Sequence, residues 1–377
     1  MGIYEVHFGS SIGNTIHSIN IWIKELRKRY VFRIIILNLN GKIGFGGGNG
    51  YDLAVSFFGG SLFIDDNRIF CDGGEGGKNI RGIIHRKLLL YHDAAYYFLN
   101  QLEQVRTKER KMGQKYILPE YGNFRESVAL AKEFDCAFEY QDFFMPEILD
   151  SRSKQEKIIA HYAGMRTDFS EDTMHGAFFD VAVHSMDSLM REASALRIRQ
   201  SMDIAKRMGL GGVVFHTGRI GGLRDAYYLK RWLEMNGKFF RGLAEEYPDI
   251  NIYLENVFDE APDILAKLAK SMTDVKNFGI CLDYAHAALT GYSGEDWVEE
   301  LAPYIRHLHV SDHDLIHDLH QPLGDGKINW QLFERLMWQY QVESGVVVEV
   351  KGTEAQRKSL EYMKQYHVYP MNGQKGE

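Results

Sequence analysis

The stretch GICLDYAHA, residues 279–287, contains the pattern that decides the fold. A short run suited to a β-strand ends on the carboxylate of Asp283, and His286 follows three residues later. Taken alone, Asp283 is equally well explained as the N-cap of a helix with a surface histidine behind it. Strand-like runs that end on a carboxylate or an imidazole recur along the chain, however, so one explanation has to account for all of these strand ends.

Outward from this stretch, short β-rich runs alternate with amphipathic helical stretches. The predicted strands are residues 116–119, 136–140, 173–177, 212–216, 251–255, 279–283, 306–310 and 345–350. Helices are predicted between them, among others at 123–134, 188–208, 224–246 and 330–340. Eight strands separated by helices are the count of a (β/α)8 barrel, in which the loops after the strands form the catalytic face. The sequence therefore predicts an α/β protein with a TIM barrel at residues 112–367 and a polar tail at 368–377.

Six consecutive predicted strands, from the third to the eighth, place a carboxylate or an imidazole at or near their C-terminal ends. These residues are His175, His216, Glu255, Asp283 with His286, His309 with Asp318 and His320 in the loop behind it, and Glu349. Closure of a barrel gathers all the strand ends around one opening. Several carboxylates buried there without partners would repel one another, and a divalent cation removes that repulsion by binding oxygen and nitrogen ligands. The pattern therefore predicts a metal site.

The motifs around these residues resemble a known family. HG (175–176), FHTG (215–218), EN (255–256), LDYAHA (282–287), HVSD (309–312) and DLHQPLGDG (318–326) are similar to the xylose-isomerase-like TIM barrel superfamily. That superfamily contains sugar phosphate isomerases and epimerases, and also abasic-site nucleases of the endonuclease IV type. The resemblance covers residues 112–367 and nothing before them.

The resemblance to the sugar enzymes implies one divalent ion (Mn, Co, Mg or Zn) held by Glu255, Asp283, His309 and Glu349. Such an ion would bind a carbonyl and a neighbouring hydroxyl of the sugar, lower the pKa of the adjacent C–H and stabilise an enediolate. By the same resemblance, Glu255 and Glu349 form the acid/base pair that removes and returns the proton. His286 would orient a substrate oxygen.

The resemblance to the nucleases implies a different chemistry on the same residues. That family holds three zinc ions with nine ligands, which here would add His175, His216, His286, Asp318 and His320 to the four already named. Zinc would then supply a hydroxide that attacks a phosphodiester. A third alternative is a metal-binding barrel that has lost its activity.

Charge favours a sugar over a nucleic acid. Residues 112–377 hold 29 Lys and Arg against 41 Asp and Glu, whereas a protein that binds DNA needs cations to neutralise phosphates. The loop after the second predicted strand, QDFFMPE (141–147), is acidic and aromatic. We therefore expect a small sugar as partner rather than nucleic acid, with Phe143 and Trp330 stacking on it and Arg219 available for a phosphate. The sequence does not identify the sugar, its phosphorylation, or whether the protein forms a homo-oligomer.

Residues 1–111 differ from the rest, with 15 Lys and Arg against 10 Asp and Glu, and with clusters of glycine between short apolar runs. We predict a helix within 84–111 and assign the segment no function. It is either a small appended domain or sequence upstream of a true start at Met112.

Three cysteines far apart, no secretory signal and no apolar run of the ~18 residues that a membrane span needs lead us to expect a cytoplasmic protein without a membrane segment.

Overall fold

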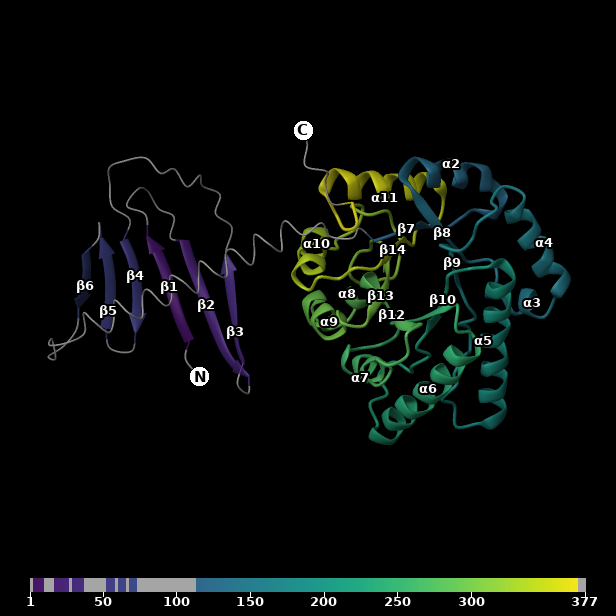
Figure 1. Cartoon of the computed structure of the whole chain (residues 1–377), viewed down its shortest axis with the longest axis horizontal. Coiled ribbons are helices and arrows are strands. Elements are labelled where there is room, and N and C mark those ends of the chain that lie inside the picture. Colours follow the sequence, from purple (N-terminus) through teal and green to yellow (C-terminus); the bar gives the residue numbers. More distant parts are fainter. Residues whose placement is uncertain are drawn as a thin grey trace. The chain divides into compact units, whose positions relative to one another are not determined.

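The computed structural model describes residues 113–371 without a break and, before them, the backbone of six strands at 3–9, 17–26, 29–36, 52–57, 60–65 and 68–72. The chain divides into two compact units, Met1–Lys108 and Glu109–Glu377 (Figure 1). Each unit is described by itself below.

The first unit contains one antiparallel sheet in the order β3-β2-β1-β4-β5-β6. Its strands are β1 (Ile3–Gly9), β2 (His17–Leu26), β3 (Arg29–Ile36), β4 (Asp52–Phe57), β5 (Gly60–Asp65) and β6 (Arg68–Asp72). Sequence analysis predicted none of them, because the apolar runs are short and lack a clean alternation. The helix predicted within 84–111 lies outside the described residues.

The second unit is a closed barrel of parallel strands in the order β10-β11-β12-β13-β14-β7-β8-β9 (Figure 1). The strands are β7 (Lys115–Ile117), β8 (Cys136–Tyr140), β9 (Thr173–His175), β10 (Gly212–His216), β11 (Asn251–Glu255), β12 (Phe278–Asp283), β13 (Ile305–Val310) and β14 (Gly345–Val348). Each predicted strand overlaps one of them. The predicted (β/α)8 barrel is therefore confirmed.

Helices follow the strands and cover the outside of the barrel (Figure 1). They are α2 (Phe124–Phe134), α3 (Pro146–Leu149), α4 (Arg152–Ala163), α5 (Ser188–Met208), α6 (Ala226–Glu246), α7 (Asp263–Ser271), α8 (Tyr284–Ala288), α9 (Gly294–Leu301), α10 (Trp330–Gln339) and α11 (Thr353–Tyr366), with a 3₁₀ turn at Tyr121–Asn123. Local sequence sets their limits. Asp187 caps the first turn of α5 by accepting from the Leu189 N–H, and Gly209 ends that helix at a φ of 74° that favours glycine.

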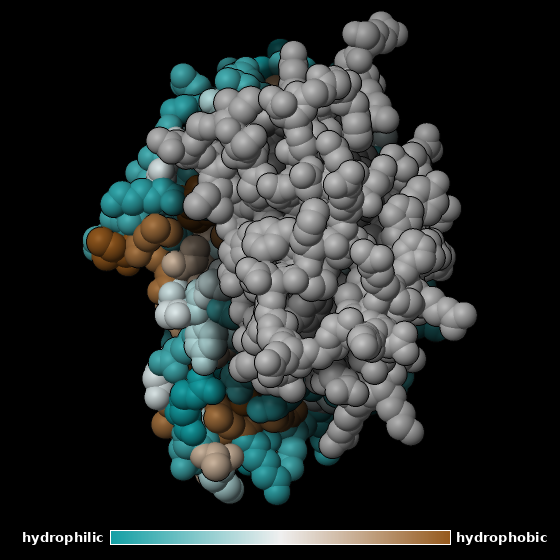
Figure 2. Space-filling model, turned by 90° about the vertical axis from the view of Figure 1, so that its left-hand side faces the viewer, coloured by the Kyte–Doolittle hydropathy of each residue, from teal (hydrophilic) through white to brown (hydrophobic). Residues whose placement is uncertain are grey.

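The hydrophobic core lies mainly between the strands and the helices. On β7, Ile117 belongs to this outer core, whereas Tyr116 and Leu118 form a separate inner cluster with Ala137 and Val347. This alternation follows from the strand period of two and leaves alternate side chains inside the barrel. No helix among the described residues is long and apolar enough to cross a membrane. Where described residues are visible along the left and lower margin of Figure 2, hydrophobic side chains lie among hydrophilic ones.

Candidate metal centre

The nine residues predicted from the strand ends lie together at the carboxyl end of the barrel. The parallel register explains this, since His216 pairs with Glu255 on the next strand and Asp283 pairs with His309. His175 ends β9, and Glu349 follows the last residue of β14. Strands that end at the same height therefore bring side chains from distant parts of the chain to one place.

Four of these residues, Glu255, Asp283, His309 and Glu349, form the centre of the site. Each offers a ligand atom within 4.8 Å of the others. The Nδ1 atom of His309 lies 3.3 Å from Glu255 Oε1 and 3.0 Å from Glu349 Oε2. Each of these four residues is at most 9% exposed to solvent.

Four polar atoms of these four residues have no hydrogen bond from the described residues, namely Asp283 Oδ2, Glu349 Oε2 and both ring nitrogens of His309. Unsatisfied polar atoms in a protein interior are rare and need an explanation. Three carboxylates and one imidazole nitrogen are a donor set that divalent cations accept. The residues present therefore fit a divalent ion.

The electrostatics at Asp283 agree with this reading. Burial and then the nearby Glu349 and Glu255 carboxylates raise the pKa of Asp283 to about 7, although His286 opposes the shift. Burial would lower the pKa of His286, but Asp283 and Asp318 outweigh it and raise the pKa well above its ordinary value. Without an ion, the centre thus tends to hold protons where a cation would bind.

Two further groups flank the centre. Glu255 Oε2 lies 3.3 Å from His175 Nε2 and 3.5 Å from His216 Nε2. On the other side, Asp318 Oδ2 lies 3.3 Å from both His286 Nε2 and His320 Nε2. The structure therefore places the five additional predicted ligands around the same opening, in two groups of ligating side chains.

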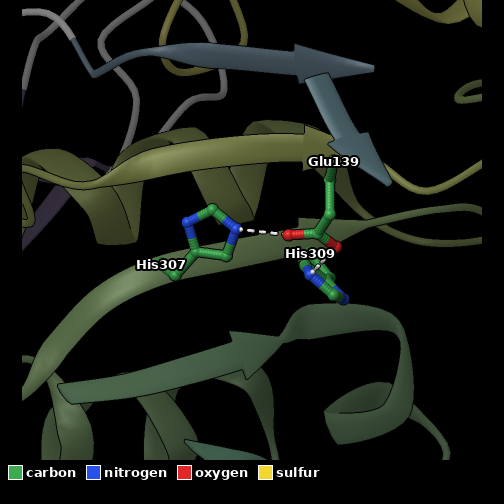
Figure 3. Close-up of side chains that lie close together, drawn as sticks. All are labelled: Glu139, His307 and His309. Atoms are coloured by element: carbon green, nitrogen blue, oxygen red, sulfur yellow. Dashed lines mark hydrogen bonds and ion pairs between the residues drawn. The ribbon is translucent and has the colours of Figure 1, made fainter. Parts of the chain in front are cut away.

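Neighbouring side chains that sequence analysis missed hold the ligands in place. Asn256 clamps the backbone of Asp283, since its Nδ2 donates to Asp283 O and its Oδ1 accepts from Asp283 N, both at 2.9 Å. Gln141 Nε2 donates to Glu349 Oε1 at 3.0 Å. Glu139 lies beside His309 and His307 inside the barrel (Figure 3). A charged residue within the otherwise apolar strand 136–140 was the available signal for Glu139.

The three residues predicted to contact substrate are buried instead. Phe143 is 0% exposed and Trp330 is 1% exposed, and the Trp330 Nε1 donates to Asp312 Oδ2 at 2.9 Å. Arg219, also buried, pairs with Asp259 at 3.1 Å. The structure thus places Phe143 and Trp330 in the core and Arg219 against Asp259, while Nε and Nη2 of Arg219 have no hydrogen bond from the described residues.

A cavity of about 550 Å³ opens beside the flanking group of His286 and Asp318. Its lining also includes Glu260 and Asp259, whose carboxylate is buried against Arg219 and Thr217, and none of the residues that line it is a lysine or arginine. The remaining lining residues are Gly221, Gly222, Val257, Phe258, Leu289, Thr290 and Gly291. The cavity next to the candidate ligands is thus an acidic one.

Several known proteins resemble this chain. MJ1311 of Methanocaldococcus jannaschii is 30% identical over 208 residues, covering 52% of this chain and 70% of that protein. A protein called "Probable endonuclease 4" from Protochlamydia amoebophila is 36% identical over 89 residues, 19% of this chain and 31% of that protein. The crystal structure of a D-tagatose 3-epimerase-like protein has a TM-score of 0.55 at 24% identity, covering 67% of this chain and 97% of the other.

The structural likeness, at 24% sequence identity, shows the fold alone. The family evidence is broader, because residues 138–366 match the family described as xylose isomerase-like TIM barrel, which is more than half of the chain. The chain therefore belongs to the xylose isomerase-like TIM barrel family.

Proposed function

We propose that the protein is a divalent-metal-dependent sugar isomerase or epimerase. The observation that carries the proposal is the pair Glu255 and Glu349, which approach the same nitrogen of His309 from two strands at 3.3 and 3.0 Å. Beside them lies Asp283, whose Oδ2 has no hydrogen bond from the described residues. A divalent ion bound here would polarise a substrate carbonyl and acidify the neighbouring C–H.

The two glutamates are suited to move the proton. In each glutamate, one carboxylate oxygen faces the centre. The second oxygen contacts another side chain, which is Gln141 in the case of Glu349 and His175 in the case of Glu255. One carboxylate would take the proton from the substrate carbon and the other would return it, with His286 orienting a substrate oxygen. Burial of both carboxylates keeps bulk water from competing for that proton.

The acidic cavity supports an uncharged sugar over a sugar phosphate. Glu260 and Asp318 line the space beside His286, and no lysine or arginine lines it, so a phosphate there would lack a permanently charged cation. A D-tagatose 3-epimerase-like protein shares this fold, which supports a ketose as the substrate.

A second candidate is a zinc-dependent abasic-site nuclease. It is favoured by the separation of the candidate ligands into a centre and two flanking groups, and by the match of 89 residues to "Probable endonuclease 4". Against it stands the excess of acidic residues in 112–377, which opposes the phosphates of DNA.

Deuterium exchange separates the two. We expect the protein, loaded with Mn, Co, Mg or Zn, to incorporate solvent deuterium into one ketose of a panel of free and phosphorylated sugars. Glu349→Gln should lower that exchange by about 10²–10⁴-fold, the usual range for a lost general acid or base. Glu133→Gln, an exposed residue on α2, is the matched control and should leave the rate unchanged. Cleavage of an abasic-site duplex without exchange into any sugar would replace this proposal by the nuclease.

A further inference from the structure

We propose that Glu139 is a positioning residue for His309. In this role its carboxylate lies behind the ring and directs Nδ1 of the histidine at the metal centre. The proposal rests on the proposed function, because it concerns the same centre, but it concerns a residue in the strand interior rather than at a strand end. Glu139 is on β8 and is fully buried.

The position of Glu139 is fixed by three contacts. Its Oε1 lies 2.9 Å from His309 Nε2, and its Oε2 lies 3.0 Å from His307 Nε2 (Figure 3). Thr173 donates to the same Oε2 at 2.8 Å. One oxygen is thus held by two neighbours, and the other remains for His309.

His307 is itself held firmly. It lies two residues before His309 on β13, so the strand period of two directs both rings to the inside of the barrel. The Tyr253 ring stacks on it at 4.7 Å with an interplanar angle of 9°, and the Tyr116 ring meets it edge-on at 5.1 Å. A ring packed on two sides leaves the Glu139 carboxylate little freedom to turn away.

This arrangement selects one tautomer of His309. An ionised carboxylate only accepts hydrogen bonds, so a negative charge 2.9 Å from Nε2 favours the imidazole that carries its proton there. The contact is a close ionic one, since the Nε2–H does not point straight at the oxygen. Glu255 and Glu349 would draw a proton to Nδ1 in the same way, but a divalent ion bound between them would exclude that proton, so the lone pair would reside on Nδ1. Carboxylates that orient metal-binding histidines in this way are a recurrent feature of metal sites.

Burial supports the same role. A carboxylate in the barrel interior is unfavourable without partners. Among the described residues, the polar partners of Glu139 are the two histidines and Thr173, and none of them is a lysine or arginine. The groups that compensate the buried carboxylate therefore include a residue of the centre.

Metal binding by the full chain tests the proposal without any substrate. Glu139→Gln keeps the shape and removes the charge, and we expect it to weaken Co²⁺ binding by about 10–100-fold. The number of ions per chain should stay the same, and the visible absorption of bound Co²⁺ should shift, because the geometry at His309 changes. Asp172→Asn removes an equally buried carboxylate, one that contacts Arg166 and Tyr140 instead, and should leave affinity and spectrum unchanged.

The outcomes are distinct. If Glu139→Gln does not fold, Glu139→Asp keeps the charge one methylene further back, and its affinity should fall between that of the wild type and background. Wild-type affinity and spectrum in Glu139→Gln would overturn the role of Glu139 and leave the proposed function standing. Loss of one whole ion per chain would also overturn it, since Glu139 would then be a ligand. No binding of Co²⁺ by the wild-type protein would instead remove the metal centre, and both proposals with it.

Discussion

Two buried aspartates near the carboxyl end of the barrel, Asp283 and Asp312, have opposite surroundings. Both are 0% exposed. The two oxygens of Asp312 accept four hydrogen bonds at 2.9–3.1 Å, from the backbone N–H groups of His313, Gly324 and Ile328 and from Trp330 Nε1. Asp283 accepts one bond from the His286 N–H at 2.7 Å through Oδ1, and its Oδ2 has no hydrogen bond from the described residues.

The difference separates a structural acid from a functional one. Asp312 ties the loop after β13 to the start of α10, so its charge is compensated within the fold. Asp283 instead faces Glu255 and Glu349, and their like charges raise its pKa together with burial. A buried charge left without partners is unfavourable for folding, and it is kept where a ligand completes the set. The two aspartates should therefore respond oppositely to the same substitution.

The largest expected effect comes from that pair of substitutions. Asp283→Asn should lower the affinity for a divalent ion by more than about 100-fold, because it removes a charged ligand. The same change should leave the metal-free protein as stable as the wild type or more so, since it relieves repulsion. Asp312→Asn should lower the free energy of unfolding by about 3 kcal/mol, because an amide group cannot accept all four hydrogen bonds.

Isothermal titration with Mn²⁺ or Zn²⁺ and denaturant unfolding in EDTA measure the two quantities on the same samples. The contrast between the aspartates would be lost if Asp283→Asn destabilised the metal-free protein as much as Asp312→Asn does. It would also be lost if Asp312→Asn weakened metal binding as much as Asp283→Asn does.

A smaller effect is expected from pH. The pKa of Asp283 is raised to about 7, so the folded state holds its proton more tightly than the unfolded state. Stability from this group is therefore lost as pH rises from about 4 through 7, and the raised pKa of His286 acts in the same direction above pH 6.5. A divalent ion at the centre needs Asp283 deprotonated, so it should restore more stability at pH 8 than at pH 6.

Thermal unfolding with EDTA or with added Mn²⁺, at pH 6 and pH 8, checks this expectation. The metal-induced rise in Tm should be several degrees larger at pH 8, and Asp283→Asn should reduce that difference. Equal rises at the two pH values would argue against Asp283 as a ligand.

Much of this site was predictable because its side chains lie at the ends of the strands. Glu255 and Asp283 stand at the last positions of runs that are otherwise apolar, and barrel closure then places them together. The fold needed no more than the alternation of these runs with helices. Contacts between distant segments were harder, and the pairing of Arg219 with Asp259 across 40 residues leaves no local pattern.

The sequence also did not show which individual aromatic residues are buried. Trp330 starts α10 and turns its indole inward to Asp312, a contact set by the loop geometry after β13. Glu139 was missed because the sequence did not show which side chains of its strand point into the barrel. All five residues of β8 are buried, so the strand has no polar face that would mark which side chains point into the barrel.

The smallest expected effect concerns a buried histidine outside the candidate metal centre, His184 between β9 and α5. Burial, and then the charge of Arg231, lower the pKa of His184 to about 4, the reverse of the shift at His286. Its Nδ1 has no hydrogen bond from the described residues, and Tyr228 Oη lies 3.3 Å from its Nε2. The neutral ring is therefore the form that the fold accepts.

Stability from His184 is complete above pH 6.5 and is lost as pH falls from 6.5 toward 4, because the unfolded chain takes up the proton first. His184→Gln should remove this loss and flatten the decline in stability between pH 6.5 and pH 5 by about 1–2 kcal/mol. Urea unfolding in EDTA at these two pH values measures the change, with His317→Gln, an exposed histidine, as the control. An unchanged slope in His184→Gln would mean that the acid response comes from other groups.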